Sequence, residues 1–244
     1  MLSGTSRLPG ENGKDYAYRV IRENIMNLNL KPGQAISEVD LAAALQLSRT
    51  PVREVMSRLK EEYLVDVIPQ VGTYISKIDA QLIEEAAFMR FTLEKEVLPL
   101  ACKEVSPESL TEIRQNVERQ ESLRTRRGEA AAFHALDNEF HRLIFRSCGK
   151  EHVWDSITRL STHYNRMRLL FEMEHHFGEA VEQHKEITEM IATGRTMQTE
   201  EQAYRHILAP ILHWKESLGH TERYAAYFKS QEVFDIAPSG SSIV

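Results

Sequence analysis

The sequence predicts a mainly α-helical protein built from a small mixed head followed by a larger bundle of helices. Residues 15–78 show three helical patterns and then two short β-prone runs, which is the layout of a winged helix-turn-helix. From residue 79 onward the strand signals stop, and about six amphipathic helical patterns follow, as in an antiparallel helical bundle. The net charge differs between the two parts, and every histidine lies in the second.

The composition is that of an ordinary soluble protein. Of the 244 residues, 42% are hydrophobic and 27% are charged. The apolar runs are far shorter than the roughly 20 residues of a membrane span, and residues 1–10 lack a secretory pattern. Two cysteines, Cys102 and Cys148, are too few for a disulfide framework or a Cys-rich zinc site. We therefore expect a cytoplasmic protein with no membrane partner.

The charge distribution separates the two parts. The whole chain has 30 basic and 36 acidic residues, a net charge of -6. Residues 1–78 hold ten basic and nine acidic residues, so the remainder holds 20 basic and 27 acidic residues, a net charge of -7. All ten histidines lie between His134 and His220. The acidic average therefore does not exclude a nucleic-acid partner for the head.

Local signals set the elements of the head. A Ser-x-x-acid pattern begins the second helix at Ser37. Pro51 suits the first turn of the third helix, because that amide needs no partner. Residues 1–14 are polar and lack an apolar period, so we expect a mobile arm there. The predicted elements are helices over 15–28, about 37–45 and 49–63, then a hairpin of 64–68 and 73–76 around a turn at 69–72.

The helical domain is expected to span residues 79–230, and residues 231–244 are expected to form a loose tail. The last main helix should kink at Pro210, and further helix is possible near 221–229. The six main helices are predicted over about 82–100, 107–125, 129–146, 151–172, 179–192, and from 199 past 214.

The third helix of the head has the features of a DNA-reading helix. Its core face should carry four apolar residues at i, i+3, i+4 and i+7, namely Val52, Val55, Met56 and Leu59. Arg49 and Arg53, four residues apart, point the other way beside Thr50. Arginine can donate two hydrogen bonds to one guanine in the major groove. The alternative is that Arg53 merely pairs with solvent or a nearby acid on an exposed helix.

This part of the chain closely resembles the N-terminal domain of the GntR family of transcription regulators. The resemblance rests on Ser48-Arg49-Thr50-Pro51-Val52-Arg53-Glu54, on the preceding Ile36-Ser37-Glu38, and on Gly72 in the wing. It implies that Arg49, Thr50 and Arg53 contact operator DNA, and that Gly72 lets the wing approach it closely. We expect the wing tip with Thr73 to lie along the DNA backbone or in the adjacent minor groove. Val39 stands where some relatives carry a base-contacting arginine, so the operator can differ.

The histidines of the second part suggest a metal site. Asp137 and His141 are four residues apart and share a helix face, while His184 and His206 lie on two later helices. Three imidazoles and one carboxylate suit Zn, Ni, Mn or Fe. On spacing alone, the alternative is that these are ordinary surface or hydrogen-bonded core histidines.

The same residues are similar to the FCD effector domain of the FadR-like GntR subfamily. The similarity runs through Asp137-Asn138-Glu139-Phe140-His141 and then Gly149, His184, Gly194 and His206. Metal-binding members use one Asp and three His in this order, which implies a divalent metal held by Asp137, His141, His184 and His206. Six main helices fit the shorter, VanR-like branch better than the seven-helix branch.

Arg90 interrupts an apolar stripe, so its guanidinium should point inward. It can pair with Glu94 one turn later, or it can bind the carboxylate of an effector. The family resemblance favours the effector, because an arginine at this place often faces the ligand cavity. Tyr164 and Arg166 are expected to complete the cavity.

Taken together, these features predict a homodimeric transcription regulator, more specifically a repressor, and not an enzyme. Its partners would be operator DNA and a small carboxylic or sugar acid that acts with the metal. Two alternatives remain open, a metalloenzyme with a fused DNA-binding head and a plain metal sensor. Turnover of candidate acids would reveal the enzyme, and a response to metal without an organic ligand would reveal the sensor.

Overall fold

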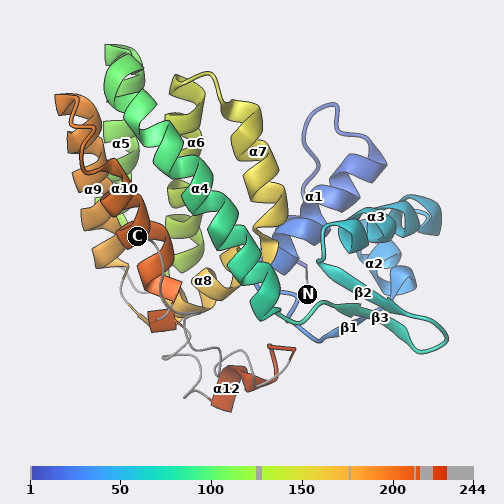
Figure 1. Cartoon of the computed structure of the whole chain (residues 1–244). Helices are drawn as coiled ribbons and strands as arrows, with labels where there is room; N and C mark the ends of the chain where they lie inside the picture. Colours follow the sequence, from blue (N-terminus) through green and yellow to red (C-terminus); the bar gives the residue numbers. More distant parts are fainter. Residues whose placement is uncertain (1, 125–127, 176, 212, 215–221, 230–244) are drawn as a thin grey trace. The chain divides into compact units, whose positions relative to one another are not determined.

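In the computed structural model, the described residues are 2–124, 128–175, 177–211, 213–214 and 222–229 (Figure 1). The chain divides into two compact units. The first contains residues 2–80 together with 222–229, and the second contains residues 81–214. The predicted tail, residues 231–244, lies outside the described residues.

The first unit has the predicted three helices and hairpin. The hairpin strands pair antiparallel, with Val65 opposite Ile75 and Ile68 opposite Gly72. A third strand of two residues pairs with the far edge of the hairpin, giving the order β1-β3-β2. This strand was not predicted, because two residues cannot show an alternating pattern. The elements are α1 (Gly13–Met26), β1 (Ala35–Ile36), α2 (Glu38–Leu45), α3 (Arg49–Glu61), β2 (Val65–Ile68) and β3 (Gly72–Ile75).

Capping and core packing explain why α2 and α3 form a fixed pair. Ser37 caps α2 as predicted, its hydroxyl accepting the amide of Asp40 at 3.3 Å. Gln46 ends α2 in the left-handed conformation and turns the chain toward α3. The predicted apolar face of α3 is fully buried, which confirms the i, i+3, i+4, i+7 pattern; its members are Val52, Val55, Met56 and Leu59.

The C-terminal segment joins the first unit. Ile78 donates to the carbonyl of Tyr227 and accepts from the amide of Lys229, and it forms a parallel bridge with Phe228. The short helix α12 (Glu222–Ala225) precedes this bridge. The expected end of the helical domain at residue 230 is therefore not where the structure divides the chain.

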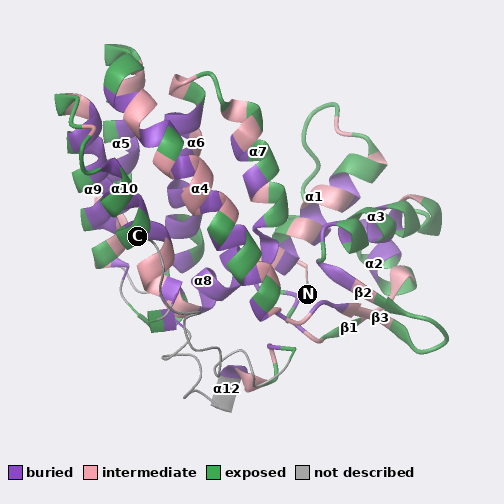
Figure 2. Ribbon diagram, in the orientation of Figure 1, coloured by how far each residue is buried: buried purple, intermediate pink, exposed green. Residues whose placement is uncertain are grey.

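The second unit is all-helical. In it, α5 lies against both α6 and α9, and α6 also contacts α7 and α8. Buried residues line the sides of the helices that face one another (Figure 2). Among the described residues, no helix is both long and apolar enough to span a membrane. The elements are α4 (Ala80–Glu104), α5 (Pro107–Leu123), α6 (Ala130–Ser147), α7 (Glu151–Leu160), α8 (Thr162–Glu174), α9 (Gly178–Thr193), α10 (Thr199–Ala203) and the π-helical turn η1 (Tyr204–Leu208).

The stretch 151–172, predicted as one helix, is in fact two. The break between α7 and α8 falls at Ser161, and neither Pro nor Gly marks it in the sequence. The nine residues that follow, 162–170, are all buried, so this part of α8 is enclosed by protein on every side. This division removes the helix count on which the expectation of a VanR-like branch rested. Both arginines in the enclosed stretch of α8, Arg166 and Arg168, are buried.

The irregularity expected at Pro210 is a π-helical turn just before it. In η1 the amide of Ala209 reaches back five residues to the carbonyl of Tyr204. Pro210 has no amide to give to the carbonyl of His206, and its ring would clash with that carbonyl in an α-helix. Widening the turn relieves the clash. Such turns are common at functional sites, and this one contains His206.

Candidate metal centre and nucleic-acid interface

The four predicted metal ligands meet in the interior of the second unit. Asp137 and His141 come from α6, His184 from α9 and His206 from η1. All four are buried, and one ligand atom from each lies within 4.8 Å of the others. Residues separated by up to 69 positions therefore form one cluster.

The distances suit a single small cation. His206 Nε2 lies 3.1 Å from His141 Nε2 and 3.2 Å from His184 Nε2, and the latter is 3.2 Å from Asp137 Oδ1. Ligand atoms about 2.1 Å from one ion stand roughly 3.0–3.4 Å apart at octahedral or tetrahedral angles. The gap between His141 Nε2 and Asp137 Oδ1 is wider, at 3.9 Å. The donor set fits a divalent first-row metal.

Each of the three imidazoles is held through its other nitrogen. His141 Nδ1 lies 2.8 Å from Glu94 Oε2, and His184 Nδ1 lies 2.6 Å from Gln120 Oε1. His206 Nδ1 lies 2.8 Å from Gln183 Oε1. These oxygens can only accept, so each Nδ1 carries the proton and each Nε2 presents its lone pair to the shared point.

The amide of Gln120 is itself oriented. Its Nε2 donates to Asn116 Oδ1 at 2.7 Å, which leaves Oε1 facing His184. Both side chains lie on α5 and are buried. Sequence reasoning missed Gln120 and Gln183, because a glutamine on a helix has no pattern that marks it as a histidine partner. Glu94 was named only as a partner of Arg90.

Two buried arginines balance the acidic groups around the cluster. Arg168 donates to both oxygens of Asp137 at 2.5 Å and, through Nε, to Glu172 Oε1 at 2.7 Å. Arg90 donates through Nε to Glu94 Oε1 at 2.9 Å. With neutral histidines, three carboxylates and two guanidiniums leave this group with one net negative charge.

Burial and these charges set the protonation states. Burial lowers the pKa of His184 to about 4, although the Asp137 carboxylate opposes the shift. Burial, with the neighbouring His184 and His141, lowers the pKa of His206 well below its usual value. For Asp137, burial would raise the pKa, but the charge of Arg168 and the histidine contacts hold it well below its usual value. At neutral pH, His184 and His206 are neutral and Asp137 is ionised, the forms that bind metal.

Arg90 forms the ion pair considered for it, and it also keeps a donor that an effector carboxylate could use. The ion pair with Glu94 is present, and the side chain is 2% exposed. Its Nη2 is buried yet has no hydrogen-bond partner among the described residues. The guanidinium carbon lies 5.0 Å from the ring centre of Tyr164 and 5.4 Å from that of Trp154. A donor therefore remains for a further acceptor.

The other two predicted effector residues lie on α8 and are fully buried. Tyr164 packs between Arg90 and Trp214, whose ring centre is 5.5 Å away. Arg166 lies beside His163, with Nη2 3.2 Å from Nδ1. It is Arg168, two residues later, that contacts a predicted metal ligand. No pattern in the sequence distinguishes these two arginines, because the residues around both are buried on every side of the helix.

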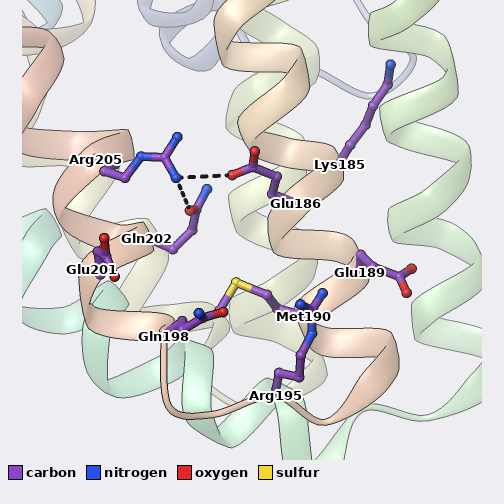
Figure 3. A pocket seen from close by; sticks show the side chains of 9 residues that line it. All are labelled: Lys185, Glu186, Glu189, Met190, Arg195, Gln198, Glu201, Gln202 and Arg205. Atoms are coloured by element: carbon purple, nitrogen blue, oxygen red, sulfur yellow. Dashed lines mark hydrogen bonds and ion pairs between the residues drawn. The ribbon is translucent and has the colours of Figure 1, made fainter.

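A cavity of about 290 Å³ borders the cluster. It reaches His206 and Arg168 on its inner side and has an aromatic wall formed by Phe171, Phe177 and Trp214. A larger cavity of about 520 Å³ lies between α9 and α10 (Figure 3). Its lining is polar, with Arg205 contacting Glu186 and Gln202, and it includes none of the four predicted ligands. The smaller cavity is the one next to the cluster.

In the first unit, the predicted reading residues lie on the solvent side of α3. Arg49, Thr50 and Arg53 are exposed, opposite the buried apolar face. Arg53 is 70% exposed, and its Nε lies 3.4 Å from Glu38 Oε2. Exposed pairs of this kind contribute little to stability, so the guanidinium can exchange Glu38 for another acceptor.

The wing extends from the same unit. Gly72 and Thr73 begin β3, next to a tip formed by residues 69–71. Val71 at the tip is 66% exposed, and Val39 on α2 is also exposed. Single exposed apolar side chains such as these are ordinary on a protein surface and do not by themselves indicate a binding face.

Two family models match this chain in succession. The one described as "Bacterial regulatory proteins, gntR family" matches residues 14–75, and the one described as "FCD domain" matches residues 85–209. The boundary between them coincides with the division between the two units.

Similar proteins include an "Uncharacterized HTH-type transcriptional regulator in unstable DNA locus" from Streptomyces ambofaciens. It is 33% identical over 187 residues, which cover 76% of this chain and 78% of that protein. The "HTH-type transcriptional repressor RspR" of Escherichia coli K12 is 29% identical over 170 residues, covering 70% and 74%.

Solved structures show the same fold. "E. coli McbR/YncC" superposes with a TM-score of 0.73 at 16% identity, covering 85% of this chain and 99% of that chain. A putative GntR regulator from Rhodococcus sp. RHA1 gives a TM-score of 0.65 at 21% identity, covering 86% and 99%.

Proposed function

Because the chain belongs to the GntR family of bacterial regulatory proteins and carries an FCD domain, it is a DNA-binding transcription regulator, and we propose that a divalent metal and a small organic acid control it. One observation carries this proposal. Three buried imidazoles, each with its Nδ1 proton held by a dedicated oxygen, turn their Nε2 atoms toward Asp137 and toward each other. That arrangement is costly to build unless a cation binds there.

The proposed cation is Zn, Ni, Mn or Fe, held by Asp137, His141, His184 and His206. Imidazole and carboxylate ligands suit all four metals. When bound, the ion supplies two positive charges and can accept oxygen ligands at open positions. The residues supply fixed donors in an enclosed site.

The charge balance favours an acidic effector. A divalent ion changes the net charge of the group from one negative to one positive, which a single carboxylate would neutralise. The cavity beside His206 and Arg168 gives such a ligand room, and Arg168 lies on its wall. Arg90 and Tyr164 are not among the residues that line this cavity. Arg90 instead offers a buried, unpaired Nη2, with Tyr164 packed against its guanidinium. Arg166 supports α8 through its contact with His163.

We further propose that the protein is a homodimeric repressor. Arg49, Thr50 and Arg53 of each chain read one half of a near-palindromic operator, and Gly72 and Thr73 bring the wing to the DNA backbone. The acid favours a conformation in which the two reading helices no longer match the operator, which is a population shift. The name of the E. coli relative, a repressor, supports this sign of regulation.

Metal analysis and ligand screening test the proposal. Protein purified without chelators should carry about one divalent ion per chain, and His184→Ala should lose most of it. His152→Ala is the matched control, because His152 is a fully exposed histidine on α7. Small organic and sugar acids are then screened for thermal stabilisation with and without EDTA.

The outcomes separate the alternatives. A regulator of the proposed kind is stabilised by an acid only when metal is present, and that acid releases operator DNA. Release by metal alone would identify a metal sensor. Consumption of an acid by the pure protein would identify an enzyme. Absence of metal from untreated protein would refute the four-residue site.

A further inference from the structure

The N-terminal arm, defined as residues 2–12, is docked on α1. Ser3 donates its amide to Asn24 Oδ1 at 2.8 Å and accepts from Asn24 Nδ2 at 2.9 Å. Tyr16 donates its hydroxyl to the carbonyl of Thr5 at 2.6 Å, and Arg19 Nη2 donates to that of Ser6 at 2.9 Å. Asn24 and Tyr16 are buried, so these anchors belong to the core of the first unit.

A tight turn then leads the arm into α1. Pro9 and Gly10 occupy its centre, Gly10 has a φ of +76°, and the amide of Glu11 donates to the carbonyl of Leu8 at 3.1 Å. These are the marks of a type II turn. Asn12 follows as the N-cap of α1. We expected this arm to be mobile because its sequence has no apolar periodicity. In the structure it follows a defined path, because hydrogen bonds to α1 hold it in place.

This path fixes Arg7 near the turn of the helix-turn-helix. Its guanidinium carbon lies 5.0 Å from the ring centre of Tyr16. A Cβ placed on Gly13 would be 3.9 Å from Arg7 Nη2 and 3.2 Å from a methyl group of Leu47. Leu47 lies in the turn between α2 and α3, two residues before Arg49. Arg7 is thus on the flank of the reading helix.

The guanidinium of Arg7 has no ion-pair partner of its own among the described residues, although its charge adds to that of Arg19 in lowering the pKa of Glu11. The side chain of Arg7 is exposed. Glu11, the carboxylate of the same turn, accepts from Arg19 through both of its oxygens. Lys14, the next basic residue, is paired with Glu54 on α3 at 2.8 Å. A cation ordered against an aromatic ring but left without an anion is suited to bind one from outside.

We propose that Arg7 binds a phosphate of the DNA backbone beside the reading helix, which makes the N-terminal arm a third DNA-contacting element besides α3 and the wing. A phosphate is the partner because Arg7 flanks the turn rather than standing on the base-reading side of α3. The logarithm of the DNA-binding constant falls linearly with the logarithm of the salt concentration. Each phosphate that a protein cation neutralises contributes about -0.9 to this slope. The inference rests on α3 being the reading helix.

The test uses the full-length protein and a DNA duplex that it selects from a random pool. Binding is measured by fluorescence anisotropy at several salt concentrations. Arg7→Gln should weaken binding and make the salt dependence shallower by about 0.9 per bound chain. Arg7→Lys should keep most of the slope. Arg114→Gln, which removes an exposed arginine from α5, controls for the loss of net charge.

The result that would overturn the inference is an Arg7→Gln protein with the affinity and salt slope of the wild type. A loss confined to duplexes with one particular base would also overturn it, because a phosphate contact acts on all sequences alike. Failure of the reading-helix assignment looks different. In that case Arg53→Ala leaves sequence preference intact, whatever Arg7→Gln does.

Discussion

Arg168 on α8 binds Asp137 on α6 through two hydrogen bonds of 2.5 Å, one to each carboxylate oxygen. One of these oxygens, Asp137 Oδ1, also lies 3.2 Å from His184 Nε2. It therefore faces the point toward which the Nε2 atoms of the three histidines turn. A metal ion could take Oδ1 while Oδ2 keeps its bond to Arg168. The arginine therefore orients the carboxylate and compensates the cost of burying its charge, and under our proposal it would hold Oδ1 toward the metal.

This relationship gives a stability prediction. Arg168→Met should lower the free energy of unfolding of metal-free protein by about 3–5 kcal/mol, because it leaves the Asp137 charge buried without its partner. Saturating Zn²⁺ should recover part of the loss, since the cation then neutralises Asp137. Urea denaturation of the wild type and the variant, each with EDTA or Zn²⁺, measures both effects.

The control is Arg142→Met on α6. Arg142 also forms two carboxylate contacts, to Glu139 and Glu151, but its side chain is 34% exposed. Its loss should lower the free energy of unfolding by no more than about 1 kcal/mol. Equal effects of the two substitutions would show that Asp137 does not depend on Arg168.

The clustering of Asp137, His141, His184 and His206 could be predicted from the sequence, and the partners of these four residues could not. Asp137 and His141 share a helix face because they are four residues apart, and the family pattern adds His184 and His206. Gln120, Gln183 and Arg168 join the site only through packing of α5, α9 and α8 around α6. Such contacts depend on helix rotation and register, which spacing along the chain does not specify.

Some elements of the fold could also be predicted from the sequence, and others could not. Apolar periodicity located the helices and the hairpin, since it reports which face is buried. The break at Ser161 has no local signal, because both halves continue the helical pattern. The ordered path of the N-terminal arm was not predicted, because the arm is held by long-range polar contacts and not by an apolar periodicity. Its anchors, such as Asn24 and Tyr16, are polar groups whose partners lie up to 21 residues away.

The histidine partners give a prediction about metal affinity. Gln120→Leu removes the acceptor of the His184 Nδ1 proton, so the imidazole is free to rotate or to change tautomer. We expect the affinity for Zn²⁺ to fall about 10–100-fold, measured by competition with a chromophoric chelator. Gln115→Leu, on the exposed side of α5, should leave the affinity unchanged. Wild-type affinity in Gln120→Leu would mean that the hydrogen bond does not orient His184.

The reading helix gives a prediction about DNA. Arg53→Ala should weaken specific operator binding by about 1–3 kcal/mol if Arg53 makes two hydrogen bonds to a guanine. The loss should disappear on duplexes in which that base pair is changed. Lys60→Ala, at the far end of α3, should show no such dependence on sequence. Circular dichroism and gel filtration check that helical content and assembly are retained. Normal operator binding by Arg53→Ala would exclude it from base reading.

The last prediction concerns the effector and depends on separating two roles of Arg90. Its Nε holds Glu94, which holds His141, so Arg90→Ala would disturb the metal site as well as any ligand contact. Arg90→Lys keeps a positive charge beside Glu94 but removes the planar group that carries the unpaired Nη2. We therefore expect this variant to retain its metal and its operator binding in the absence of effector.

What should change in Arg90→Lys is the response to the acid. Operator and effector weaken each other's binding, typically by about 1–3 kcal/mol, and a weaker acid contact raises the concentration needed for release. Both tryptophans of the chain report on the site, since Trp154 stacks 5.3 Å from His141 and Trp214 lines the cavity. Intrinsic fluorescence titration with the best acid from the thermal screen should thus give a higher dissociation constant for Arg90→Lys, and no binding to metal-stripped protein. Equal dissociation constants for wild type and variant would remove Arg90 from the effector site, while binding without metal would remove the metal from it.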